Sequence, residues 1–255
     1  MITTDHRPGS PCWIELSASD PGSSLAFYGG LFGWEAESAG PDTGGYMILR
    51  SRGRAVGGAG PLMEAGQPPA WTLYFHTPDA EAGVRRVAEL GGTVGVEPVD
   101  VMGMGVMAHC ADPQGVGFAL WQPLSFPGLE AVDEPGSLMW TELWTPDAEG
   151  ALEFYTALFS WDSTPFPLPG GSTYRIVRPG GLPDERAHGG IAQASGTGDW
   201  HPVFHVEDVD GAAALVAETG GRVTMAPDDA AGVGRLSACT DPDGNAFVLL
   251  RPSPA

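Results

Sequence analysis

The chain has 255 residues, of which 42% are hydrophobic, and its formal net charge at pH 7 is −20. Its twelve basic residues other than histidine are all arginine, so no lysine can form a Schiff base or contact phosphate in a P-loop. A surface this acidic repels nucleic acid and anionic membranes, and we expect neither as a partner.

Cysteine content and apolar patterning indicate a cytoplasmic protein. The three cysteines are an odd number in a long chain and do not make a disulfide framework; Cys110 and Cys239 are expected to be small core residues. No apolar stretch follows a basic region near the first residue, so no signal peptide is expected. No apolar run approaches the length of about 18 residues that a membrane span needs.

The elements predicted in the first half follow one order twice: a strand, a helix, then further strands. Asp20 and Asp79 are the expected N-caps of the two helices, and Gly91 ends the second. A hairpin turn is predicted at DPQG, 112–115. The first group comprises strand 13–19, helix 21–32 and strands 46–51 and 55–62; the second comprises strand 71–77, helix 80–90 and strands 93–99, 106–111 and 115–122.

The second half of the chain repeats the first. PCWIEL, which begins at Pro11, returns as SLMWTEL from Ser137, and FYGGLFGW returns as FYTALFSW. The identities continue at an offset of 129 through the DPxG hairpin. We therefore expect an α+β fold of four βαβββ modules in two tandem domains, 10–123 and 137–252, joined by a Pro- and acid-rich linker, 124–136.

These features together resemble the vicinal oxygen chelate superfamily, which includes glyoxalase I, bleomycin-resistance proteins and extradiol dioxygenases. The resemblance rests on the four modules, FYxxLFGW after the first helix and DPxG near the end of each half. The chain is similar to tandem actinobacterial members of that superfamily described as glyoxalase-like or as hydroxylases, including accessory proteins of antibiotic pathways. The resemblance implies two glyoxalase-like domains whose curved mixed sheets form cups.

The resemblance also implies where metal ligands would lie, and most of these positions lack a donor. The first-strand ligand corresponds to Trp13 and Trp140, where indoles fill the space of a metal. Metal sites need three or more converging N, O or S ligands, and only His201 among these positions can supply one. We therefore predict no metal and no other cofactor. The remaining positions correspond to Thr72, Ala119, Val248 and the stretches near Gly58 and Gly190.

Strand alternation predicts which side chains share the face of the cup with the two indoles. Aromatic rings with a few polar groups suit a flat apolar ligand with polar edges. The residues expected to bind it are Trp13, Trp140, Tyr74, Trp121, Trp144 and His201. The expected catalytic residues are Glu15, Glu142, His76 and His205, because a Glu–His pair can perform acid–base chemistry.

Each assignment has a structural alternative. A strand tryptophan can belong to the core, which is the expectation for Trp34 and Trp161. The histidines at 76 and 205 can be interior residues satisfied by hydrogen bonds, and the two glutamates need a partner or contact with water. His109 and His188 are expected to have no role, since His109 aligns with alanine and His188 lies in a loop.

Three functions remain open. The first is a metal-free binding protein for an aromatic natural product such as a polyketide, in antibiotic sequestration, self-resistance or biosynthesis. The second is a cofactor-free isomerase, cyclase or hydroxylase-type tailoring enzyme that uses Glu–His pairs. The third is a metal-dependent glyoxalase-type lyase. A monomer or weak dimer is expected, because the duplication supplies all four modules in one chain.

Overall fold

The computed structural model describes residues 1–64 and 66–253, and a strand, a helix and three strands follow one another four times along it. This order confirms the α+β class and the four modules. The chain divides into two compact units. Unit 1 comprises Met1–Trp13, Thr72–Gly128 and Trp140–Trp200, and unit 2 comprises Ile14–Trp71, Leu129–Met139 and His201–Ala255.

Unit 1 is built mainly from modules 2 and 3. Its strands run in the orders β5-β8-β7-β6 and β10-β11-β12-β9, with β5–β8 and β9–β12 parallel and the other pairs antiparallel. Module 2 comprises β5 (Ala70–His76), α2 (Ala80–Glu89), β6 (Thr93–Asp100), β7 (Gly105–Ala111) and β8 (Gly117–Pro123). Module 3 comprises β9 (Leu138–Thr145), α3 (Ala148–Phe159), β10 (Trp161–Pro167), η1 (Pro169–Gly171), β11 (Thr173–Pro179), η2 (Asp184–Arg186) and β12 (Gly189–Gln193).

Unit 2 is built mainly from modules 1 and 4, with strand orders β2-β3-β4-β1 and β13-β16-β15-β14. Each compact unit therefore joins one module from each half of the sequence repeat, and the first strand of every module passes from one unit to the other. Module 1 comprises β1 (Pro11–Ala18), α1 (Pro21–Phe32), β2 (Glu35–Ser38), β3 (Met47–Ser51) and β4 (Arg54–Pro61). Module 4 comprises β13 (Asp199–His205), α4 (Val209–Glu218), β14 (Arg222–Ala230), β15 (Gly234–Thr240) and β16 (Ala246–Pro252).

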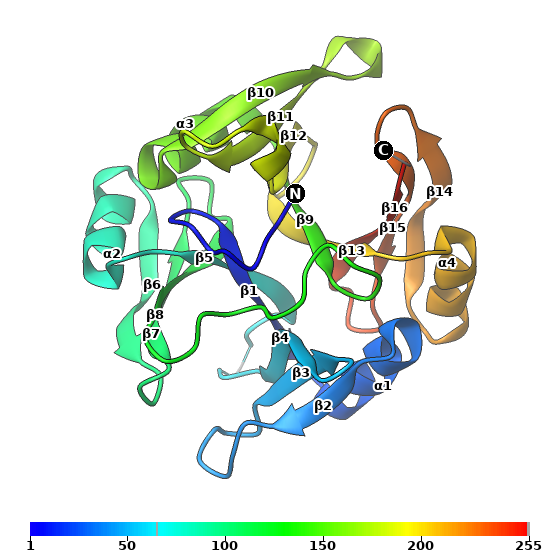
Figure 1. Ribbon diagram of the computed structural model, residues 1–255, viewed down its shortest axis with the longest axis horizontal. Coiled ribbons are helices and arrows are strands. Elements are labelled where there is room, and N and C mark those ends of the chain that lie inside the picture. The colour runs from blue at the N-terminus through cyan, green and yellow to red at the C-terminus, as the bar shows by residue number, and fades with distance from the viewer. Residues whose placement is uncertain (65, 254–255) are drawn as a thin grey trace. The chain divides into compact units, whose positions relative to one another are not determined.

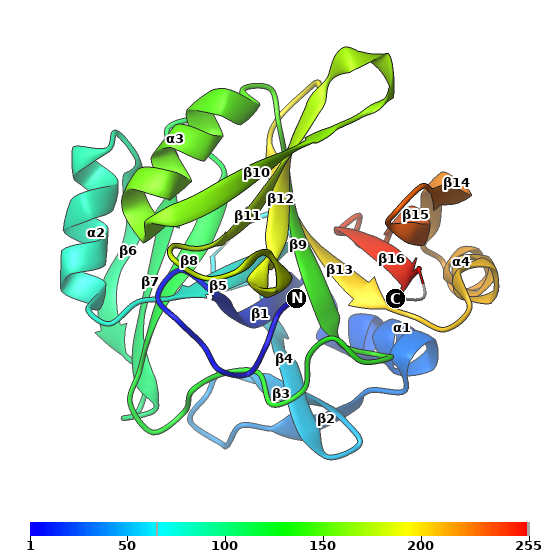
Figure 2. The same cartoon turned by 45° about the horizontal axis from the view of Figure 1, so that its top comes forward.

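The helices pack in pairs within the units. In unit 1 α2 and α3 lie side by side, and in unit 2 α1 and α4 do so (Figures 1 and 2). A glycine follows α2 and α4, where the partner helix packs closely. A Cβ on Gly92, after α2, would lie 3.2 Å from the Phe154 ring of α3, and one on Gly221, after α4, would lie 3.1 Å from the Phe27 ring of α1. The predicted caps are confirmed, since Asp20 accepts from the Ser23 amide.

A buried polar network explains why FY, a central-strand Trp and DPxG recur in both halves. In unit 1 the Trp200 indole donates to Tyr155 Oη over 3.0 Å, and Tyr155 donates to Asp112 Oδ2 over 3.4 Å. In unit 2 the equivalent distances, from Trp71 to Tyr28 and from Tyr28 to Asp241, are 2.9 and 3.1 Å. The network links a helix, a central strand and a hairpin turn within the aromatic core of each unit.

Trp34 and Trp161 are core residues, as expected. Both are buried, and their indoles donate to the carbonyl oxygens of Gly136 and Gly9, over 2.7 and 2.9 Å. The three cysteines are buried and free.

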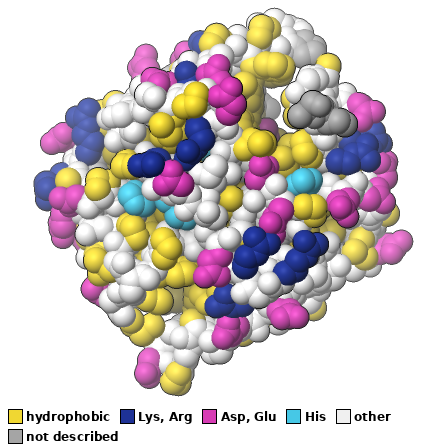
Figure 3. Space-filling model, viewed as in Figure 1, with side chains coloured by type: hydrophobic (Ala, Val, Ile, Leu, Met, Phe, Trp, Pro, Cys, Tyr) yellow, Lys and Arg dark blue, Asp and Glu magenta, His cyan; other side chains and the backbone are white. Residues whose placement is uncertain are grey.

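Charged side chains are scattered over the surface, and arginines lie beside acidic residues on the face shown in Figure 3. Several arginines form ion pairs, for example Arg175 with Glu149 at 2.7 Å. Among the described residues, no helix is long and apolar enough to cross a membrane.

Candidate functional site

Strand β9 presents one polar and aromatic face. Trp140, Glu142 and Trp144 are partly exposed, whereas the intervening Thr141 and Leu143 are buried. This alternation follows from the two-residue period of a strand, and it confirms that the indoles and the carboxylate share a side. These three residues belong to unit 1.

The side chains on this face form a continuous hydrogen-bonded set, here called the Glu142 array: Trp140, Glu142, Trp144 and Tyr174. The Trp140 indole donates to Tyr174 Oη over 2.8 Å, and Tyr174 donates to Glu142 Oε1 over 3.0 Å. The Trp144 indole donates to Glu142 Oε2 over 2.9 Å. Both carboxylate oxygens are therefore held by neutral donors.

Tyr174 reaches the carboxylate because a glycine lies beneath its ring. Gly190 of β12 is opposite Glu142 in the parallel register, and Tyr174 is on the neighbouring strand β11. A Cβ on Gly190 would lie 2.0 Å from Tyr174 Cζ. The phenol thus occupies the space that a side chain at position 190 would take, where the family resemblance places a metal ligand.

Burial dominates the electrostatics of the array. It raises the pKa of Glu142, and the hydrogen bonds from Trp144 and Tyr174 oppose this rise only in part. Burial and the nearby charge of Glu142 raise the pKa of Tyr174 well above its ordinary value, so the phenol stays protonated. The partners of Glu142 are a phenol and an indole, where the sequence predicted a histidine.

A second polar contact in unit 1 joins Tyr74 of β5 to His109 of β7. Tyr74 Oη lies 3.2 Å from His109 Nε2, and the two rings meet edge to face. Tyr74 was expected in the site, whereas His109 was given no role because its repeat counterpart is alanine. A difference between the halves was the signal available, since it marks a position where one half needs a polar partner.

Trp13 and Trp121 are both covered by Phe126. The Trp121 indole donates to the Phe126 carbonyl oxygen over 3.0 Å, and the Phe126 ring meets Trp13 at a centroid distance of 5.1 Å. Trp13 and Trp121 are only 5% and 7% exposed. Their assignment as ligand-binding residues stays a prediction.

His76 and His205 end the equivalent strands β5 and β13. The His76 amide donates to Ser10 O in unit 1, and the His205 amide donates to Ser137 O in unit 2. Burial lowers the pKa of His76. These backbone bonds give both histidines a structural position at a strand end, and their catalytic role stays a prediction.

Unit 2 repeats the geometry of tyrosine over glycine. Glu15 of β1 is opposite Gly58 of β4, and a Cβ on Gly58 would lie 2.0 Å from the Tyr46 hydroxyl. Glu15 is partly exposed, and His201 is buried. Sequence reasoning missed both tyrosines. Their signal is Y-x-I-x-R, which occurs from Tyr46 and again from Tyr174.

The residues at the family's metal positions do not fit a metal. They include indole, glycine, alanine and valine side chains, which supply no ligand, and one histidine. Within residues 1–64 and 66–253, no group of three or more His, Cys, Asp and Glu side chains is placed to hold a metal ion.

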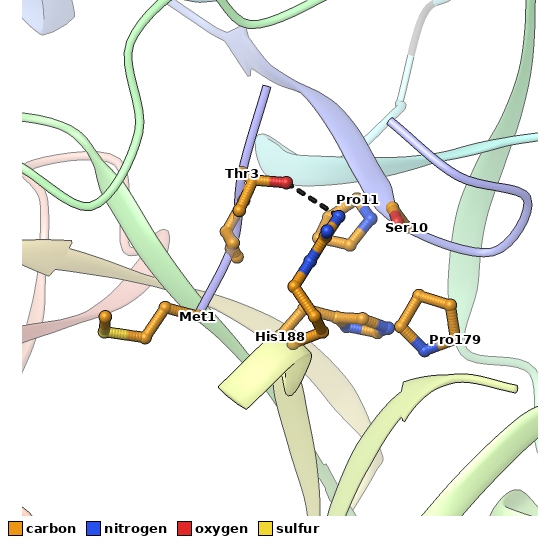
Figure 4. A pocket seen from close by; sticks show the side chains of 8 residues that line it. Met1, Thr3, Ser10, Pro11, Pro179 and His188 are labelled. Atoms are coloured by element: carbon orange, nitrogen blue, oxygen red, sulfur yellow. Dashed lines mark hydrogen bonds between the residues drawn. The ribbon is translucent and has the colours of Figure 1, made fainter. Parts of the chain in front are cut away.

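His188 lines a separate small cavity in unit 1, beside the amino-terminal segment (Figure 4). Arg186 donates to Thr3 Oγ1 over 2.9 Å at its edge. His188 is 2% exposed, and neither of its ring nitrogens has a hydrogen-bond partner among the described residues. Burial, joined by the charge of the amino terminus, lowers its pKa to about 3. At about 10 Å³ the cavity is too small for an organic ligand.

Comparison with known proteins places this geometry in a family. The model of the glyoxalase/bleomycin resistance protein/dioxygenase superfamily matches residues 137–249, and that of a glyoxalase-like domain matches residues 13–121. The anthracycline biosynthesis protein DnrV of Streptomyces peucetius is 34% identical over 97% of this chain and 94% of its own. The chain belongs to the glyoxalase/bleomycin resistance protein/dioxygenase superfamily.

Two further relatives extend the comparison across this superfamily. CFP32 of Mycobacterium tuberculosis (strain CDC 1551 / Oshkosh), a provisionally named glyoxylase, is 33% identical over 98% of both chains. The 2,3-dioxygenase LapB from Pseudomonas sp. KL28 has a similar fold, with a TM-score of 0.65 and 15% identity over 96% of this chain and 93% of its own. The likeness to LapB shows the fold alone, and function has to be argued from the site.

Proposed function

We propose that this protein binds a planar aromatic natural product without a metal, in sequestration, self-resistance or biosynthesis of an antibiotic. The Glu142 array carries the proposal. It offers two indoles and a phenol, all partly exposed, around one carboxylate. Aromatic rings bind flat apolar ligands by stacking, and a few polar groups fix their orientation. The 34% identity to an anthracycline biosynthesis protein supports this ligand class.

The proposal excludes a metal because the site has too few donor atoms. An indole in place of a first-strand ligand, and a glycine beneath a tyrosine ring in place of another, leave too few donors for a closed coordination shell. Elemental analysis of the purified protein is the check. About one tightly bound transition-metal ion per chain would contradict the proposal and favour a glyoxalase-type lyase.

A second candidate is a cofactor-free tailoring enzyme, favoured by the contact between Tyr174 and Glu142. A carboxyl group with a raised pKa beside a phenol can take up or deliver a proton at a bound ligand. Mass spectrometry of an aromatic polyketide after incubation with the protein separates the two candidates. A product whose formation is lost in Glu142→Gln and Tyr174→Phe would establish turnover.

Binding is tested by titrating tryptophan fluorescence with an anthraquinone. Stacking contributes about 0.5–1.5 kcal/mol per aromatic pair beyond burial, so Trp140→Leu should weaken binding by about two- to tenfold. Met63→Ala is the control, because Met63 is 82% exposed and lies in unit 2. Equal affinities in wild type and Trp140→Leu would exclude this indole from the ligand site.

The oligomeric state belongs to the same proposal. A monomer or weak dimer is expected because one chain contains all four modules. Analytical ultracentrifugation with and without ligand checks this, and a tight dimer formed only with ligand would contradict it.

A further inference from the structure

The hydrogen bonds of the Glu142 array have a fixed direction. An indole N–H can only donate, so Trp140 makes Tyr174 Oη an acceptor, and the phenol's own proton is directed to Glu142. Trp144 donates to the other carboxylate oxygen. The hydrogens of Tyr174 and Trp144 therefore point to the carboxylate, that of Trp140 points to the phenol oxygen, and the lone pairs that remain on the carboxylate can only accept.

Glu142 has no cationic partner among the described residues. Its hydrogen bonds come from Tyr174 and Trp144, and its pKa is affected by burial and by these two neutral donors alone. The arginines nearest along β11 are engaged elsewhere: Arg175 binds Glu149 at 2.7 Å, and Arg178 binds Asp184 at 3.0 Å. A partly buried carboxylate without a cation is costly, and a positively charged ligand would offset that cost.

The surroundings of the carboxylate also favour a cation. Indole and phenol rings attract ammonium groups through their π faces, and an aromatic cage is a common way to bind organic amines. The net charge of −20 adds a long-range attraction for cations and repels anions. A neutral hydroxyl could also donate to Glu142, but neither the π faces of the rings nor the net negative charge would attract it.

We infer that the aromatic ligand carries a protonated amine, and that Glu142 accepts a hydrogen bond from its ammonium group beside the rings of Trp140, Trp144 and Tyr174. This inference rests on the proposed function, because it specifies the chemistry of the ligand that the same site would bind. Glu142 then determines specificity, and the rings supply most of the contact area.

The experiment compares an anthraquinone bearing an aminoethyl side chain with its N-acetylated derivative, in which a neutral amide replaces the protonated amine. Affinities are measured by tryptophan fluorescence at pH 7.5 in wild type, Glu142→Gln and Glu153→Gln. The last variant is the control, because it removes one negative charge from an exposed residue of the same unit and leaves the Arg175–Glu149 pair in place. Glutamine has the shape of glutamate, and its oxygen can accept from Trp144 while its amide donates to Tyr174 Oη, so that the phenol proton no longer has Glu142 as its acceptor.

We expect the amine to bind at least tenfold more tightly than the acetylated probe in wild type and in Glu153→Gln, since hydrogen bonds between charged groups are about twice as strong as neutral ones. Glu142→Gln should lose this preference. If that variant does not fold, the wild-type preference should still disappear as the pH falls and Glu142 becomes protonated.

The outcomes separate the two proposals. Equal binding of both probes to wild type would overturn the amine and leave the aromatic binding site standing. A preference that survives in folded Glu142→Gln would overturn the role of this carboxylate. Binding of neither probe would overturn the proposed function together with the inference.

Discussion

Replacement of His188 by leucine should remove a large part of the acid sensitivity of this protein. In the folded state the pKa of His188 is about 3, because the ring is buried and the amino terminus is positively charged, whereas the ordinary value is 6.5. Between these values the unfolded chain binds a proton that the folded chain does not. The free energy of unfolding of the wild type therefore falls as the pH drops from 6.5 toward 3. Above pH 6.5 His188 is neutral in both states and does not change this free energy.

The magnitude follows from the width of that window. Each pH unit below 6.5 lowers the free energy of unfolding of the wild type by about 1.4 kcal/mol, so it is lower by about 2.7 kcal/mol at pH 4.5. His188→Leu lacks this loss. At neutral pH the variant should be as stable as wild type or more so, because it removes a buried imidazole whose nitrogens have no partners among the described residues.

Urea unfolding of both proteins at pH 7.5, 6.0, 5.0 and 4.5 is the assay. The difference between the two unfolding free energies isolates His188, since the other titrating groups are common to both. An NMR titration of the imidazole supplies the folded-state pKa directly. A difference that stays constant from pH 7.5 to 4.5 would refute the reasoning, as would a folded-state pKa near 6.5.

Three further substitutions test the packing of the two units. Tyr155→Phe in unit 1 should lower the free energy of unfolding by about 1–3 kcal/mol, because Trp200 and Asp112 lose a buried partner. Tyr28→Phe in unit 2 should lower it by a similar amount, and chemical denaturation measures both. Gly190→Ala should displace the Tyr174 ring, lower the melting temperature and weaken ligand binding. Removing the ring in Gly190→Ala/Tyr174→Ala should restore part of the stability, and a Gly190→Ala protein with wild-type melting and affinity would contradict the close packing.

The parts of the fold that depend on local chemistry could be predicted from the sequence. Asp20 caps its helix and DPxG turns its hairpin, because each of these depends on a few neighbouring residues. The number of modules could be predicted because the second half of the sequence repeats the first. The shared face of Trp140, Glu142 and Trp144 followed from strand alternation in the same way.

The partners of these residues could not be predicted from the sequence. Tyr174 reaches Glu142 across an intervening strand, and it does so because Gly190 has no side chain; a glycine in a one-dimensional sequence does not say which ring lies over it. The contact of His109 with Tyr74 likewise depends on the alignment of separate strands. Strand alternation predicts the side of the sheet on which a side chain lies, but not the distance to its partner.

The pairing of helices from different halves has a consequence for how such a chain can arise. Since α1 packs with α4 and α2 with α3, a protein cut in the linker would leave every helix without its companion, and neither fragment should fold alone. A half-length ancestor would have met the same need by associating with a second copy of itself. Fusion of two such copies removes the dependence on concentration and frees each copy to accumulate its own substitutions, as the exchange of His109 for Ala238 illustrates.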